Sequence, residues 1–128
     1  MILDSSALVA VVLAEPGHES LLAKIKTSRN VGIGAPTLVE SLIVLLRRLG
    51  GDPTPVLSDL LRAFEAEVIP FAEGHCREAL RAYTRFGKGR HPAALNFGDC
   101  LSYAMASAAD EPLLYVGGDF AQTDIQPA

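Results

Sequence analysis

The architecture of the chain can be inferred from its first fourteen residues, MILDSSALVAVVLA (1–14). It predicts a short buried strand at Met1 to Leu3, which ends at Asp4 and turns through Ser5 and Ser6 into an apolar helix. Asp4 is the only charged residue in this stretch. A carboxylate at the carboxyl end of a hydrophobic strand lies where open α/β sheets bind their ligands, but Asp is also a good helix cap. The stretch alone leaves both interpretations open, a cap and a catalytic acid.

The rest of the chain alternates strands with helices. Helices are expected over residues 18–27, 36–49, 52–66, 73–86 and 96–109. Further strands are expected over 31–34 and 113–116, and a brief one within 67–71. Strands that alternate with helices of this length predict a parallel sheet covered on both faces. No linker or internal repeat divides the sequence, so we expect one α/β domain over residues 1–128.

Composition limits the classes of function. The chain has 128 residues, 49% of them apolar and 20% charged, with a net charge of −4. A net-acidic protein meets nucleic acid through a local basic patch or through metal ions, not through a general positive field. Cys76 and Cys100 form no CxxC motif, so neither a zinc site nor a disulfide framework is expected. No segment reads as a signal peptide or membrane span, and we expect a soluble cytoplasmic protein.

Three more acids stand alone in apolar or neutral segments, as Asp4 does: Glu40, Asp99 and Asp119. Asp4 and Asp119 end predicted strands, whereas Glu40 and Asp99 lie near the starts of predicted helices. These positions belong to one edge of a parallel sheet, so the four acids can converge. Carboxylates gathered in a partly buried pocket repel one another. Mg²⁺, or Mn²⁺, relieves that repulsion with oxygen ligands and supports phosphodiester hydrolysis.

Structural explanations exist for some of these acids. Asp99 favours a helix amino end electrostatically, with Asn96 as the cap. Glu40 has the weakest structural explanation, because an acid inside an apolar helix costs several kcal/mol unless it is paired. The nearest following cation, Arg47, is too far along the helix to pair with it. Taken together, the acids favour a metal site.

Five segments of the chain resemble the PIN-domain ribonucleases, and most closely the VapC toxins of bacterial toxin–antitoxin modules. The segments are Asp4 to Leu8, Pro36 to Glu40, Asn96 to Cys100, Gly118 to Phe120 and Thr123 to Ile125. The last three are more specific than any single acid. The resemblance covers essentially the whole chain.

The resemblance implies a three-layer α/β/α sandwich and a Mg²⁺-dependent endoribonuclease that acts as a toxin. It also implies a homodimer and a cognate VapB-type antitoxin. Asp4, Glu40 and Asp99 match the family's acids directly. Gly117 and Gly118 stand where many relatives have a Thr and a further acid, so the fourth acid is either Asp119, our choice, or Asp124.

The roles of Ser6 and of two phenylalanines remain open at this stage. Ser6 either hydrogen-bonds a carboxylate or a metal-bound water, or is an ordinary helix-start serine. The pair Phe86 and Phe97 either stacks on RNA bases or packs in the core. Core packing is the better interpretation of both phenylalanines.

A cluster of basic residues precedes Asp99: Arg85, Lys88, Arg90 and His91. Such a run is often only solvated surface, but next to a predicted catalytic acid it also suits contact with RNA phosphates. For His91, nothing in the sequence fixes the geometry that a general acid needs.

Other functions fit the sequence less well. A haloacid-dehalogenase-like phosphatase needs a second Asp where Ser6 stands and a basic residue late in the chain, and no Lys or Arg follows Arg90. A response-regulator receiver needs a Lys at the end of a late strand, and this sequence has no Lys there for the same reason. The remaining alternative is a catalytically silent PIN-like module that only binds RNA or protein.

Overall fold

The computed structural model describes residues 1–128 and contains one parallel sheet with the strand order β3-β2-β1-β4. Its strands are β1 (Ile2–Leu3), β2 (Gly32–Gly34), β3 (Glu67–Ile69) and β4 (Leu113–Leu114). The helices are α1 (Ser5–Val12), α2 (His18–Thr27), α3 (Ala35–Leu49), α4 (Thr54–Ala63), α5 (Glu73–Phe86) and α6 (Phe97–Ala109), followed by a 3-10 turn, η1 (Phe120–Gln122).

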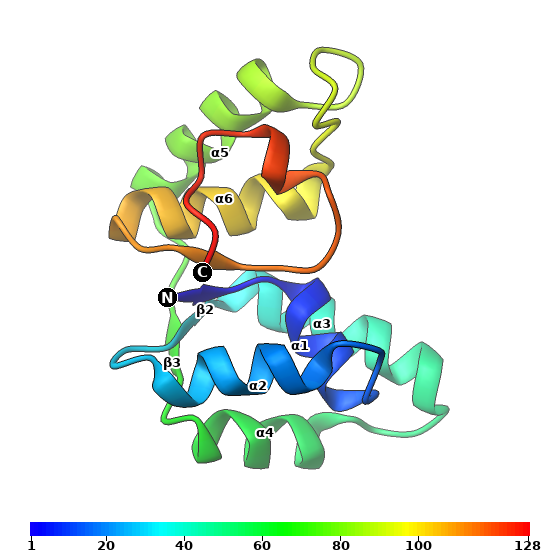
Figure 1. Ribbon diagram of the computed structural model, residues 1–128. Coiled ribbons are helices and arrows are strands. Elements are labelled where there is room, and N and C mark those ends of the chain that lie inside the picture. Colours follow the sequence, from blue (N-terminus) through cyan, green and yellow to red (C-terminus); the bar gives the residue numbers. More distant parts are fainter.

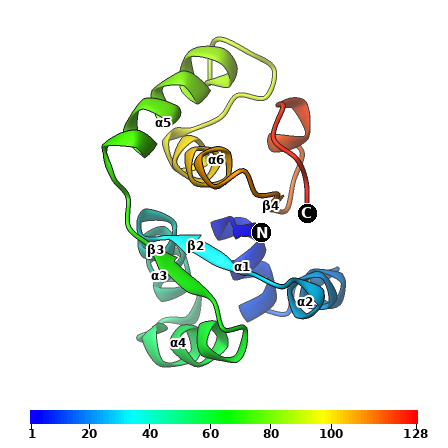
Figure 2. The same cartoon turned by 90° about the vertical axis from the view of Figure 1, so that its left-hand side faces the viewer.

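The helices form a layer on each side of the sheet (Figures 1 and 2). Helices α5 and α6 lie over one face, together with the segment that carries η1, and α1 to α4 lie over the other. This is the α/β fold that the alternation of strands and helices predicted, with the three layers that the resemblance implied.

Successive residues of β1 and β4 pack into opposite layers, as strand geometry requires. Leu3 and Leu114 belong to the hydrophobic cluster on the α1–α4 side. Ile2 and Leu113 belong to the cluster on the α5–α6 side. The two-residue strands β1 and β4 therefore join the halves of the core. Asp4, which follows β1 directly, is attached to a fully buried strand.

Most predicted boundaries are confirmed, and the differences lie at segment ends. Helix α4 ends at Ala63, three residues before its predicted end, because the backbone turns at Glu65 with a φ of 51°. Strand β3 lies within the segment where a brief strand was predicted and ends at Ile69, whereas β4 is shorter than predicted and ends at Leu114. The early end of β4 leaves residues 115–119 as a loop beside the end of β1.

Helix α3 is less enclosed than its composition suggests. One side of it is buried through Thr37, Ser41 and Leu45. The other carries large apolar side chains that are about half exposed: Val39, Ile43, Leu46 and Leu49. The chain alone therefore covers α3 on one side only.

Candidate active site

Asp4 lies at the end of β1 and is only 3% exposed. Its carboxylate accepts hydrogen bonds from the backbone N–H of Ser6 at 3.0 Å and from the Ser6 hydroxyl at 2.5 Å. Asp4 is therefore the N-cap of α1, so the structural interpretation is correct. The cap does not exclude a catalytic role, because it fixes the carboxylate at the carboxyl edge of the sheet.

Ser6 also connects the helix to the loop after β4. Its hydroxyl oxygen accepts a hydrogen bond of 3.0 Å from the backbone N–H of Val116. A single hydroxyl thus bridges the Asp4 carboxylate and the segment that leads to Asp119. This contact with the carboxylate agrees with the supporting role expected for Ser6 and shows more than an ordinary helix-start serine.

Glu40 projects from α3 toward the first turn of α6. The contact is close: a Cβ atom added to Gly98 would lie 2.6 Å from Oε1 and 2.8 Å from Oε2 of Glu40. The helix before Glu40 is anchored to the same neighbour, because the hydroxyl oxygens of Thr37 and Ser102 lie 3.1 Å apart in the core. Glu40 therefore reaches the edge of the sheet where Asp4 and Asp99 lie.

Asp99 lies in the first turn of α6 and forms a reciprocal capping box with Asn96. The Asn96 side chain accepts a hydrogen bond of 2.9 Å from the backbone N–H of Asp99, and the Asp99 carboxylate accepts one of 2.8 Å from the backbone N–H of Asn96. The expected cap at Asn96 is confirmed. It holds the Asp99 carboxylate at the amino end of the helix.

The acids act on one another electrostatically. Burial raises the pKa of Glu40, and the charges of Asp4 and Asp99 raise it further. A hydrogen bond from Ser5 lowers the pKa of Glu40 and offsets part of this increase. Burial also raises the pKa of Asp99, the hydrogen bond from the Asn96 backbone lowers it, and the charges of Asp4 and Asp119 raise it again. The charge of Asp4 therefore reaches both Glu40 and Asp99, and the charge of Asp119 reaches Asp99. We call these four residues, Asp4, Glu40, Asp99 and Asp119, the acidic cluster.

No cation balances the acidic cluster. None of its four members takes part in any ion pair of the structure. As the side chains stand, however, no three His, Cys, Asp or Glu residues lie close enough together to hold a metal ion. Asp4 and Asp99 instead face hydrogen-bond donors of their own helices. The donor set still fits a hard divalent cation, because it is made of oxygen ligands whose charge is uncompensated.

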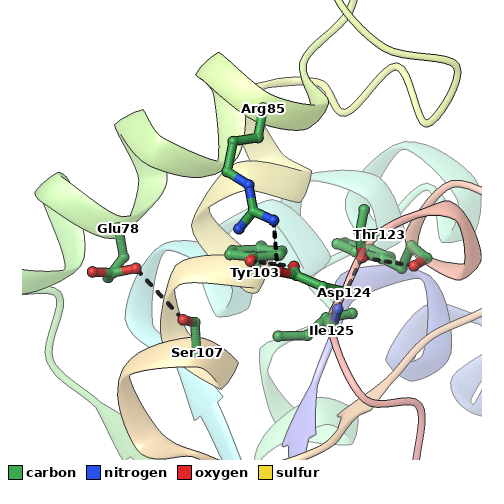
Figure 3. Close-up of polar contacts among 8 residues, drawn as sticks. Glu78, Arg85, Tyr103, Ser107, Thr123, Asp124 and Ile125 are labelled. Carbon is green, nitrogen blue, oxygen red and sulfur yellow. Dashed lines mark hydrogen bonds and ion pairs between the residues drawn. The ribbon is translucent and has the colours of Figure 1, made fainter.

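Asp124, the reserve for the fourth acid, is engaged elsewhere. Its carboxylate accepts a hydrogen bond of 2.6 Å from the Tyr103 hydroxyl and forms an ion pair of 2.8 Å with Arg85 (Figure 3). The hydrogen bond from Tyr103, followed by the bond and charge of Arg85, lowers the pKa of Asp124. Asp124 therefore ties the C-terminal segment to α5 and α6, while Asp119 is the acid whose charge reaches Asp99.

The basic cluster before Asp99 divides into two groups. Arg85 is paired with Asp124 and lies over the Phe86 ring at 4.6 Å. The His91 ring packs edge-on against Phe86 and accepts a hydrogen bond from the Ala93 backbone. Lys88 and Arg90 are exposed and form no ion pair. Contact with RNA stays a prediction for all four residues, and the exposed Lys88 and Arg90 are the best placed for it.

The two phenylalanines have different environments. Phe86 is 7% exposed, which confirms its place in the core, whereas Phe97 is 79% exposed, so core packing was the wrong expectation for it. Phe97 lines an open apolar groove of about 480 Å³ between α5 and α6, with Cys100 and Leu101 from the same side of α6.

Three residues that help to position the acids were not predicted from the sequence: Thr37, Ser102 and Gly98. The first two were not distinguished from ordinary core residues. Gly98 had a usable signal, because a glycine in the first turn of a helix weakens that helix and so suggests a steric reason for its presence.

Comparison with known proteins agrees with this geometry. The PIN domain profile matches residues 1–126. The chain belongs to the PIN-domain family and, within it, to the VapC ribonucleases. It is 43% identical to Ribonuclease VapC36 of Mycobacterium tuberculosis over 98% of this chain and 91% of that protein. It is 40% identical to Ribonuclease VapC42 of the same species, over 100% of this chain and 98% of that protein.

Two solved structures share the fold. The Mycobacterium tuberculosis toxin VapC20, which cleaves the sarcin–ricin loop, superimposes with a TM-score of 0.79 at 15% identity, over 99% of this chain and 97% of that one. A toxin–antitoxin complex from Klebsiella pneumoniae gives a TM-score of 0.70 at 13% identity, over 96% and 92% of the two chains. At these identities the likeness concerns the fold.

Family membership confirms the predicted class of enzyme, a metal-dependent ribonuclease of the toxin type. VapC toxins pair with antitoxins. None of the helices is both long and apolar enough to span a membrane. The expectation of a cytoplasmic location stays a prediction.

Proposed function

We propose that residues 1–128 form a single PIN-like domain that hydrolyses RNA phosphodiester bonds with Mg²⁺ held by the acidic cluster. The observation that supports this most directly is electrostatic. Burial raises the pKa of Glu40 and Asp99, the charge of Asp4 raises both further, and no ion pair neutralises any of the four acids. Such an arrangement is costly to the folded protein unless a cation binds there.

The chain's own residues would prepare the site in different ways. Asp4 and Asp99 are held by hydrogen bonds from Ser6 and Asn96, so their carboxylates stay at the edge of the sheet. Glu40 and Asp119 complete the ligand set from α3 and from the loop after β4. When bound, Mg²⁺ would polarise a phosphoryl oxygen and lower the pKa of a coordinated water. Mn²⁺ suits the same oxygen ligands.

Lys88 and Arg90 would contact the RNA backbone. Both side chains are exposed in the loop that leads to α6 and its Asp99. The Arg90 guanidinium lies over the exposed Tyr83 ring at 5.5 Å, which favours an extended arginine over a disordered one. In a protein of net charge −4, a local basic site of this kind supplies the attraction that the whole molecule lacks.

The partners would be a second copy of the chain and a VapB-type antitoxin. Exposed apolar side chains lie on α3, at Val39, Ile43 and Leu46, and on α5, at Leu80 and Tyr83. Large apolar patches on a small protein mark interaction surfaces. We assign the α3 surface to the homodimer that the resemblance implied, and expect the antitoxin to block the acidic cluster.

The test is to incubate the purified protein with total cellular RNA, with Mg²⁺ or with chelator, and to map new 5′ ends. We expect cleavage only with Mg²⁺, and a loss of more than about a hundredfold in Asp99→Asn, beyond what loss of a supporting partner costs. Circular dichroism of the variant should show intact folding. RNA binding without Mg²⁺-dependent cleavage would favour the silent binding module instead.

A further inference from the structure

Gly98 stands at the second position of α6, between the exposed Phe97 and the acid Asp99. Its backbone is not among the glycines with positive φ, so its conformation does not require glycine. Glycine at a helical position is less favourable than alanine, by up to about 1 kcal/mol in a helix interior. Local backbone structure therefore gives no reason for a glycine at this position.

The space beside Gly98 is filled by the carboxyl group of Glu40. The three atoms nearest to an added Cβ would be Oε1 at 2.6 Å, Oε2 at 2.8 Å and Cδ at 3.0 Å, all of Glu40. A real side chain does not tolerate such distances. Because the carboxyl group is the far end of a flexible side chain, it would move away and leave the helix backbone in place.

The two helices are unable to separate easily to make room. One turn before Glu40, Thr37 meets Ser102, which lies one turn after Asp99, and their hydroxyl oxygens are 3.1 Å apart. Both residues are buried. A buried hydroxyl left without its partner costs about 1–3 kcal/mol, so this contact resists a shift of α3 against α6. The displacement would therefore fall on the Glu40 carboxylate.

We propose that Gly98 is a positioning residue: its missing side chain is the space in which the Glu40 carboxylate reaches Asp99 and the rest of the acidic cluster. The inference rests on the proposed function, because Glu40 has to be a cation ligand for its displacement to matter. It adds a residue that touches neither cation nor RNA and acts only through Glu40.

The chain contains a closely matched control. Gly74 is also the second residue of a helix, α5, and a Cβ added there would meet nothing within 4 Å. Gly98→Ala and Gly74→Ala therefore make the same chemical change at equivalent helical positions. Only the first brings a methyl group against Glu40.

The experiment measures Mn²⁺ affinity by calorimetric titration and the free energy of unfolding by urea. In Gly98→Ala we expect the affinity to fall by about tenfold or more, within the range seen when supporting residues of metal sites are changed. Its stability should be unchanged or higher, because alanine is the better helix former. Gly74→Ala should keep its affinity within about twofold. Equal affinities in Gly98→Ala and the parent protein would overturn the inference.

A double-mutant cycle with Glu40→Gln separates this inference from the proposed function. If Gly98 acts through Glu40, Gly98→Ala should cause no further loss of Mn²⁺ affinity in the Glu40→Gln background. Equal losses in both backgrounds would overturn the positioning role while leaving the acidic cluster as the cation site. If Glu40→Gln and Asp99→Asn both bind Mn²⁺ as the parent does, the proposed cation site fails, and the role of Gly98 fails with it.

Discussion

The hydroxyl of Tyr103 donates a hydrogen bond of 2.6 Å to the carboxylate of Asp124. The bond joins the middle of α6 to the last segment of the chain, and the ion pair of Asp124 with Arg85 extends the connection to α5 (Figure 3). Burial and the Asp124 carboxylate raise the pKa of Tyr103 to about 12, so its hydroxyl stays protonated and remains a donor. Asp124 therefore has a structural task outside the acidic cluster.

Replacing Asp124 should affect stability and spare cation binding. Asp124→Ala removes a hydrogen bond and a partly exposed ion pair, together worth about 1 kcal/mol. Because the folded-state pKa of Asp124 is lowered, this contribution is present above the ordinary carboxyl pKa and is lost as pH falls through the lowered value. Urea unfolding at pH 7 should show the loss, and Mn²⁺ titration should show unchanged affinity.

Asp119→Asn is the counterpart of that variant. The exposed Asp119 forms no ion pair, so its replacement should leave the free energy of unfolding nearly unchanged and weaken Mn²⁺ binding. The reverse pattern, with affinity lost in Asp124→Ala and kept in Asp119→Asn, would make Asp124 the fourth acid.

Glu40→Gln should stabilise the cation-free protein at neutral and alkaline pH. The raised pKa of Glu40 means that its folded-state contribution is fully present below the ordinary carboxyl pKa and is lost as pH rises through the raised value. A neutral glutamine avoids that loss. With chelator at pH 8 we expect a gain below about 1 kcal/mol, because solvent partly screens this half-buried group.

The pH dependence provides the control for Glu40→Gln. Near pH 4 the glutamate is mostly protonated, so the parent protein and the variant should unfold at similar urea concentrations. A variant that is less stable than its parent at pH 8 would mean that no electrostatic repulsion acts on Glu40.

Neutralising Lys88 and Arg90 together should weaken RNA binding and flatten its dependence on salt. Each phosphate contact to a single strand contributes about 0.7 to the slope of log affinity against log salt concentration, so the double glutamine variant should lose about 1.4. Fluorescence anisotropy over a salt series measures this slope. Arg62→Gln, on α4 in the opposite layer from α6, is the control and should keep the parent slope.

Ile43→Glu should separate the expected dimer. A charge placed among the exposed apolar residues of α3 has to be desolvated when a second copy covers them, which is unfavourable. Sedimentation at micromolar concentration should show a dimer for the parent and a monomer for the variant. Val56→Glu changes an equally exposed apolar residue of α4 and should remain dimeric. A monomeric parent protein would contradict the assignment of this surface.

Local signals in the sequence account for most of the fold. The segment Glu15-Pro16-Gly17 separates α1 from α2, and Gly50 ends α3 with a φ of 71°. These predictions of the fold succeeded because each depends on a few adjacent residues. The rule that parallel strands share an edge led from the isolated acids to the acidic cluster, whose role as a cation site stays a prediction.

The contacts between distant helices were beyond such reasoning. The Thr37–Ser102 hydrogen bond and the approach of Glu40 to Gly98 each join residues more than fifty positions apart. They depend on how α3 crosses α6, which no local pattern specifies. The prediction that Phe97 packs in the core was wrong for the same reason, because a local pattern does not show what lies opposite a given side of a helix.

The acidic cluster draws Asp4 from the start of the chain and Asp99 and Asp119 from its last third. While the ribosome is still making the protein, an unfinished chain that lacks α6 holds two of these acids and lacks Gly98, against which Glu40 rests. On the proposed function, the complete cation site would therefore form only once α6 and the loop after β4 have been synthesised.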